Sequence, residues 1–162
     1  MIEIRPAEKE EVPLIQELAI AIWRPTYQGV ISEDQIDFML DKSYSREAIL
    51  QSMDTGQLFY LIFLEGLAEG FMGITVREPI LRIEKLYLNP KVQGRGLGKK
   101  FIEFAKDLAL SQGLSVLELN VNRGNKAYDF YLKQGFKVVE TVDIPYYQYV
   151  LNDYIMKKNL IS

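Results

Sequence analysis

Apolar positions along the chain follow two spacings, one typical of strands and one typical of helices. The opening residues 1–5 alternate apolar and polar, as a half-buried strand does. A packed helix face follows, with apolar residues at Ile15, Leu18, Ala19 and Ile22. We expect this helix to run to about Trp23 and to stop at Pro25, because proline disrupts a helix.

Residues 26–31 read as a loop before two short helices. Ser32 is followed by acidic residues and predicts the N-cap of the first, and the second is expected over 45–53. Three apolar runs come next and predict an antiparallel meander of strands over 58–64, 68–76 and 80–88.

Helices and strands alternate in the second half of the chain. An amphipathic helix is expected to end near Gly113, and a second, around Ala127 to Tyr131, to end at Gly135. Strands are expected over 115–121, 136–142 and 148–157, the last two joined through Pro145, Tyr146 and Tyr147. Since the chain has no linker or repeat, we expect one α+β domain over residues 1–162, with a mixed sheet of about six to seven strands and about four to five helices.

Charge and hydropathy narrow the class of partner. The 162 residues include 19 basic and 22 acidic side chains, and a net charge of −3 gives no footprint for a nucleic-acid backbone. A small cationic substrate fits this balance better. The longest apolar run, 58–64, is far shorter than the roughly 20 residues that a membrane helix needs, so we expect no membrane partner. The chain opens without a secretion signal pattern, which favours the cytoplasm.

The sequence contains no cysteine and no histidine. This excludes the Ser-His-Asp triad, thiolate nucleophiles and almost every common zinc site, so we expect no metal. Any acid–base chemistry must come from carboxylates, tyrosine, lysine or water.

Glycines at positions 94, 96 and 98 stand between a predicted strand and a predicted helix. Such a turn can aim several backbone N–H groups at one anion, and the basic side chains of Arg95, Lys99 and Lys100 favour a phosphate. The spacing fits neither the P-loop nor the dinucleotide fingerprint. The alternative is a turn that only lets the helix pack tightly.

Two motifs make the chain resemble the Gcn5-related N-acetyltransferase superfamily. Gln93, Gly96 and Gly98 match its Q/R-x-x-G-x-G/A turn, directly after a strand that is similar to the family's fourth. The second motif, N-x-A-x-x-x-Y-x-x-x-G-F, is matched by Asn125, Ala127, Tyr131, Gly135 and Phe136.

This resemblance implies acetyl-CoA as the cofactor and acetyl donor. The fourth-strand backbone would pair with the pantetheine amides, the turn would wrap the pyrophosphate and Asn125 would bind the pantetheine arm. The cofactor-binding residues implied in this way are Leu86, Tyr87, Leu88, Gln93, Gly94, Arg95, Gly96, Leu97, Gly98, Lys99, Asn125 and Tyr131.

Two residues carry the predicted catalysis. Tyr131 would lie near the thioester sulfur and protonate the departing thiolate, and Glu84 is the best candidate to take the amine proton, directly or through water. The alternatives are a core aromatic for Tyr131 and, for Glu84, an exposed member of a polar face shared with Arg82. Both alternatives stay open.

Substrate groups in this fold come largely from the first helical region and the last strands. There the chain has Trp23, Thr26, Tyr27 and Tyr146, which with Glu84 are the candidate substrate-binding residues; the aromatic ones can equally be core residues. The segments 23–27, 83–88 and 152–156 are similar to the PaiA-type branch, which acetylates spermidine and spermine.

The predicted function is therefore N-acetylation of a primary amine on a small cationic acceptor, such as a polyamine. The alternatives are acetylation of a protein amino terminus, an amino acid or an antibiotic amine, and a non-catalytic acyl-CoA-binding regulator. The family resemblance implies a possible homodimer, although the sequence contains no interface signature.

Overall fold

A computed structural model describes residues 1–161 of the chain. Two compact units make up the structure. The first comprises Met1–Thr75 and Lys85–Phe101, and the second comprises Val76–Glu84 and the chain from Ile102 onward. Strands β3 and β4 and helix α4 each contribute residues to both units.

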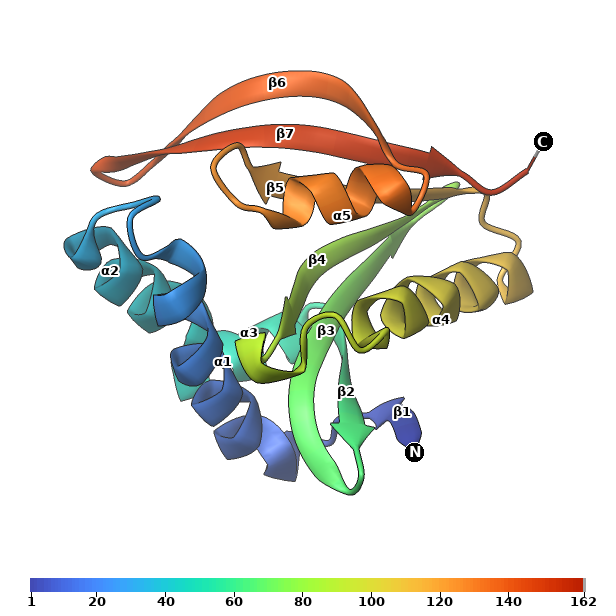
Figure 1. Cartoon of the computed structure of the whole chain (residues 1–162), viewed down its shortest axis with the longest axis horizontal. Helices are drawn as coiled ribbons and strands as arrows, with labels where there is room; N and C mark the ends of the chain where they lie inside the picture. Colours follow the sequence, from blue (N-terminus) through green and yellow to red (C-terminus); the bar gives the residue numbers. More distant parts are fainter. Residues whose placement is uncertain (162) are drawn as a thin grey trace. The chain divides into compact units, whose positions relative to one another are not determined.

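Seven strands form one sheet in the order β1-β2-β3-β4-β5-β7-β6 (Figure 1). The strands are β1 Ile2–Pro6, β2 Leu58–Leu64, β3 Leu67–Arg77, β4 Ile80–Leu88, β5 Val116–Asn122, β6 Lys137–Tyr146 and β7 Tyr149–Asn159. The helices are α1 Val12–Tyr27, α2 Glu33–Tyr44, α3 Arg46–Asp54, α4 Leu97–Ser111 and α5 Ala127–Lys133, with 3-10 turns η1 Lys9–Glu11 and η2 Pro90–Val92. This confirms the predicted α+β class with a mixed sheet.

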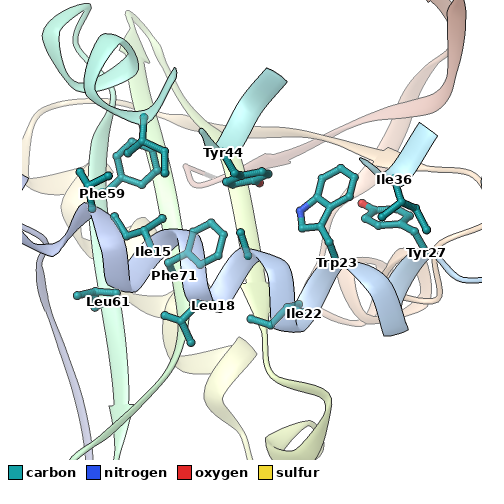
Figure 2. Packing of buried hydrophobic residues seen from close by; sticks show 13 residues of the cluster. Ile15, Leu18, Ile22, Trp23, Tyr27, Ile36, Tyr44, Phe59, Leu61 and Phe71 are labelled. Atoms are coloured by element: carbon teal, nitrogen blue, oxygen red, sulfur yellow. The ribbon is translucent and has the colours of Figure 1, made fainter. Parts of the chain in front are cut away.

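In the first unit, α1 supplies one side of a buried core. Its apolar face packs toward Leu61 and Phe71 of strands β2 and β3 (Figure 2). The strands pair antiparallel from β1 to β2 and from β2 to β3, as the meander prediction requires for this part. Serine side chains cap α2 and α3: Ser32 Oγ accepts from the Gln35 N–H at 3.1 Å, and Ser45 Oγ from the Ala48 N–H at 3.2 Å.

The prediction that the first helix stops at Pro25 was wrong. Proline removes only its own N–H, and the next turn closes without it, because the Gln28 N–H donates to Arg24 O at 3.0 Å. Tyr27 is also buried on the same helix face as Trp23, four residues earlier, and this burial favours one more helical turn.

In the second unit, β4 and β5 run parallel, with Ile80–Ile83 opposite Val116–Leu119. β7 pairs antiparallel with β5, and β6 pairs antiparallel with β7. Since β6 is the last strand of the sheet, it can hold Pro145, whose missing N–H would interrupt an inner ladder. The predicted connection between the last two strands was therefore too long, because Pro145 and Tyr146 belong to β6. The turn begins at Tyr147, whose φ is +56°.

Candidate functional site

The glycine-rich turn joins η2 to α4 within the first unit. Gly94 and Gly96 have φ values of +84° and +83°, which side-chain-bearing residues adopt only with strain. An added Cβ at either glycine would meet no atom within 4 Å, so backbone conformation and not crowding requires glycine here. Gly98 differs from these two exposed glycines, because it is buried in the first turn of α4.

The start of α4 offers donors to an anion. The Lys100 N–H donates to Gly96 O at 3.1 Å and closes the first helical turn. Helix geometry therefore leaves the N–H groups of Leu97, Gly98 and Lys99 without an intrahelical acceptor, at the positive end of the helix dipole. The side chains of Gln93, Arg95 and Lys99 are exposed around this helix start.

The end of β4 lies against β3 in the same unit. The Asn89 N–H donates to Glu69 O at 2.8 Å. A Cβ at Gly70 would lie 2.4 Å from the carbonyl oxygen of Tyr87 and 2.7 Å from Leu88 Cδ2, so only glycine permits this approach. Gly70 thus fixes the path of the backbone that the sequence predicts to bind cofactor, and sequence analysis missed it.

Aromatic side chains surround Tyr87 of β4. Its ring centroid lies 5.5 Å from Trp23 and 5.8 Å from Phe71, and Trp23 and Tyr27 are 4.4 Å apart. Trp23 and Tyr27 are only 6% and 7% exposed, so both belong to the core. The Thr26 hydroxyl donates to the backbone oxygen of Ile22 at 2.7 Å. Three of the candidate substrate residues are therefore anchored structurally.

Trp23 and Tyr44 are both buried in this core and pack edge-on, with ring centroids 5.7 Å apart (Figure 2). Burial raises the pKa of the Tyr44 hydroxyl far above its usual range, and the nearby Trp23 N–H opposes that rise. This N–H is buried and has no hydrogen-bond partner among residues 1–161. The tyrosine is therefore neutral at physiological pH.

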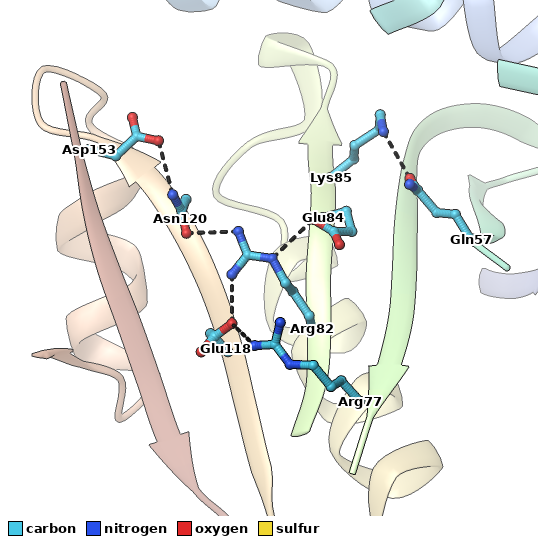
Figure 3. Close-up of polar contacts among 8 residues, drawn as sticks. All are labelled: Gln57, Arg77, Arg82, Glu84, Lys85, Glu118, Asn120 and Asp153. Carbon is cyan, nitrogen blue, oxygen red and sulfur yellow. Dashed lines mark hydrogen bonds and ion pairs between the residues drawn. The ribbon is translucent and has the colours of Figure 1, made fainter. Parts of the chain in front are cut away.

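In the second unit, Glu84 is paired with Arg82 on the same face of β4. Arg82 Nε donates to Glu84 Oε1 at 3.0 Å, Nη1 to Glu118 Oε1 at 2.8 Å and Nη2 to Asn120 Oδ1 at 2.8 Å (Figure 3). The predicted polar face shared by Arg82 and Glu84 is thus present. The Glu118 side chain is only 8% exposed. The sequence signal for this network was the alternation of polar residues, but it could not identify the partners on β5.

Asn125 lies two residues before the start of α5, and Tyr131 lies in its last turn. Asn125 Oδ1 accepts from the Ala127 N–H at 2.9 Å and orders the helix start. Tyr131 is 6% exposed, and its ring packs edge-on to Phe136 with centroids 5.7 Å apart. Tyr146 packs edge-on to Tyr147 at 4.9 Å near the end of the β6–β7 hairpin.

The predicted site residues are divided between the units. The first unit holds Trp23, Thr26, Tyr27, residues 86–88 and the turn 93–99, and it brings Trp23, Tyr27 and Tyr87 together. The second unit holds Glu84, Asn125, Tyr131 and Tyr146. Along residues 1–161, every helix is too short or too polar to cross a bilayer.

The chain matches the family model for an acetyltransferase (GNAT) domain over residues 26–145, and it therefore belongs to this family. This confirms the resemblance drawn from the two motifs and the prediction of an N-acetyltransferase.

Two acetyltransferases are similar in sequence to this chain over most of their length. The chain is 29% identical over 167 residues to a spermidine N(1)-acetyltransferase of Thermoplasma acidophilum, covering 99% of each chain. It is 33% identical over 142 residues to a peptidyl-lysine N-acetyltransferase of Salmonella typhimurium, covering 85% of each. Among solved structures, PaiA N-acetyltransferase from Thermoplasma acidophilum, in complex with coenzyme A, has a TM-score of 0.85 at 29% identity, covering 98% of this chain and 99% of that one.

Proposed function

We propose that this N-acetyltransferase transfers the acetyl group of acetyl-CoA to a primary amine of a small cationic acceptor, with a polyamine as the first candidate. The observation that carries the proposal is the glycine turn at the start of α4, with its two positive φ angles and its first helical hydrogen bond from the Lys100 N–H to Gly96 O. The three N–H groups that helix geometry leaves at this start would bind an anion. Acetyl-CoA as donor is supported by family membership and by the relative solved with coenzyme A.

The pyrophosphate would lie at residues 93–99. Backbone N–H groups of the first helical turn would donate to its oxygens, and the Arg95 and Lys99 side chains would neutralise its charge. The pantetheine amides would pair with the backbone of residues 86–88. The ladder from β4 to β5 ends at Ile83, five residues before β4 itself ends at Leu88, which supports this strand as the place for an added ligand.

Asn125 and Tyr131 would complete the cofactor contacts. The Asn125 oxygen is held by the helix start, which leaves its amide N–H₂ oriented by the same contact and suited to donate to the pantetheine arm. Tyr131 is held between Phe130 and Phe136, with centroids 5.4 Å and 5.7 Å away, so its hydroxyl has a fixed direction.

The chemistry needs no covalent enzyme intermediate. The acceptor nitrogen attacks the thioester carbonyl, the new C–N bond forms and the C–S bond breaks. Glu84, directly or through a water molecule, takes the proton that the amine loses, and Tyr131 gives a proton to the departing thiolate of coenzyme A. Every group that this scheme requires is present in a chain without cysteine or histidine.

A cationic acceptor is supported by the name of the Thermoplasma relative and by the acidic balance of the chain. In this scheme Trp23, Thr26 and Tyr27 shape the acceptor side of the site from the end of α1, and Tyr146 contributes from β6. The Salmonella relative supports a second candidate, the ε-amine of a lysine in a protein.

The test is thiol release from acetyl-CoA across a panel of polyamines, amino acids, aminoglycosides and lysine peptides. We expect release that depends on the amine and is fastest with spermidine or spermine. Fastest thiol release with a lysine peptide would contradict the polyamine and favour a protein substrate. Tight acetyl-CoA binding by calorimetry, without release across the panel, would favour a non-catalytic acyl-CoA-binding regulator.

A further inference from the structure

A polar network in the second unit crosses three strands on one face of the sheet. The register places Arg82 of β4 opposite Glu118 of β5, and Glu118 opposite Lys157 of β7. Because side chains of a strand alternate between faces, Glu84 shares the face of Arg82, and Asn120 shares that of Glu118. Figure 3 shows Glu84, Glu118 and Asn120 converging on the guanidinium of Arg82.

Glu118 is the buried anchor of this network. Its Oε1 accepts from Arg82 Nη1 at 2.8 Å and lies 3.6 Å from Arg77 Nη2, and its Oε2 lies 3.5 Å from Lys157 Nζ. Three cations thus surround one carboxylate that is 8% exposed. A charge buried this deeply holds its partners firmly, since separation would leave it uncompensated.

Asn120 provides a second anchor. Its Oδ1 accepts from Arg82 Nη2 at 2.8 Å, while its Nδ2 donates to Asp153 Oδ2 at 3.2 Å. The bond to Asp153 fixes which way the amide points, so the oxygen faces Arg82. Two of the three nitrogens of the guanidinium are therefore committed to β5, and its rigid plane directs the third, Nε, at Glu84.

We propose that Arg82 is a positioning residue for acetyl transfer, which fixes the Glu84 carboxylate through a guanidinium anchored on Glu118 and Asn120. This inference rests on the proposed function of Glu84 as the group that takes the amine proton. A carboxylate on a strand can adopt several rotamers, and only those that face the attacking nitrogen are useful. Arg82 selects among them before the substrate arrives.

A double-substitution cycle tests this role. Arg82→Lys keeps a positive charge beside Glu118, so the fold should survive, but one ammonium group cannot reach three acceptors as a guanidinium does. We expect Arg82→Lys to lower kcat about tenfold, through misplacement of Glu84, and to leave the KM for acetyl-CoA within about twofold of wild type. In a Glu84→Gln background the same substitution should change kcat by less than about twofold, because residues that act as a unit are not additive.

Asn120→Ala is the second variant, since it removes one anchor without changing any charge. It should lower kcat in the wild-type background and have no further effect with Glu84→Gln. Arg77→Gln is the matched control, because Arg77 also contacts Glu118 but is 73% exposed and is not part of the fork to Glu84. It should leave kcat unchanged. Thermal melting of each variant confirms that it is folded.

The outcomes separate the two levels of the argument. A wild type that acetylates no amine overturns the proposed function and this inference with it. A wild type that is active, combined with additive effects of Arg82→Lys and Glu84→Gln, overturns the positioning role alone. An equal loss of kcat in Arg77→Gln would also overturn it, because the effect would then follow the charge around Glu118.

Discussion

The phenolic oxygens of Tyr27 and Tyr87 lie 2.9 Å apart, so a hydrogen bond joins the last turn of α1 to β4. This turn is the one that continues past Pro25. The strand that it contacts is the one predicted to hold the cofactor backbone. One pair of hydroxyls therefore links the proposed acceptor side of the first unit to its proposed donor side.

This pair should be energetically coupled. Tyr27→Phe and Tyr87→Phe should each lower the free energy of unfolding by about 1 kcal/mol, because a part-buried hydroxyl loses a partner in each case. The double substitution should cost less than the sum, since both ends of the bond are then removed. Urea unfolding gives the free energy of unfolding of the wild type, the two single variants and the double variant. Strictly additive losses would mean that the bond contributes nothing.

The glycine turn should be required for cofactor affinity. Gly94→Ala places a side chain at φ +84° and should weaken coenzyme A binding about tenfold, equal to about 1.4 kcal/mol, because the strained backbone loses the cradle conformation. Gly113→Ala is the matched control: its φ is +75°, its added Cβ also meets open space, and it follows the opposite end of α4. Calorimetry should find wild-type affinity for the control. Equal affinities in both variants would exclude the turn as the pyrophosphate site.

Tyr131 should act on the rate of the reaction. We expect Tyr131→Phe to lower kcat about 100-fold with a smaller change in the KM for acetyl-CoA, because the departing thiolate loses its proton donor. Tyr128→Phe on the same helix is the control, since that ring packs at a tilt against Tyr154, with centroids 4.9 Å apart, and has no proposed role. Steady-state kinetics at saturating amine gives both constants. An unchanged kcat in folded Tyr131→Phe protein would remove the general acid from the scheme.

Two carboxylates should give opposite pH dependence of stability. Burial raises the pKa of Asp153, although Asn120 and nearby arginines oppose the shift. The folded state therefore binds this proton more tightly than the unfolded state, and the free energy of unfolding falls as pH rises through the raised pKa. Asp153→Asn should be more stable than wild type at about pH 7 and lose that advantage near about pH 3, below the ordinary aspartate range.

Glu11 provides the comparison of opposite sign. A hydrogen bond from Arg5, at 2.7 Å between Nη2 and Oε2, lowers the pKa of Glu11, and the backbone N–H of Glu8 adds to the effect. The stability that Glu11 contributes is present above its unfolded pKa and is lost as pH falls through the folded one. Glu11→Gln should thus be less stable than wild type at neutral pH only. Urea unfolding across the pH range tests both variants, and parallel curves would contradict both assignments.

Local signals in the sequence predicted the local features of the fold. Serine at positions 32 and 45 predicted the starts of α2 and α3, and the apolar run 58–64 coincides with β2. These features depend on neighbours within a few residues. The glycine turn is of the same kind, since its positive φ angles at Gly94 and Gly96 follow from the glycines themselves.

Features that depend on distant residues could not be predicted. Burial of Tyr27 in the core extends α1 beyond Pro25, and the edge position of β6 allows Pro145 inside a strand. The partners of Arg82 lie 36 and 38 residues away along the chain, and only the register of β4 on β5 identifies them. The need for glycine at position 70 also comes from a distant residue, because an added Cβ would lie 2.4 Å from the carbonyl oxygen of Tyr87 on the next strand. The single domain over residues 1–162, the cytoplasmic location and the homodimer stay predictions.

Product analysis tests the central claim most directly. Wild-type protein is incubated with acetyl-CoA and spermidine, free thiol is titrated, and acetylated spermidine is measured by mass spectrometry. We expect one acetylated amine for each thiol released, at a rate that saturates with spermidine and falls sharply in Tyr131→Phe. Thiol release that does not depend on the amine, or no acetylated spermidine despite bound acetyl-CoA, would contradict it.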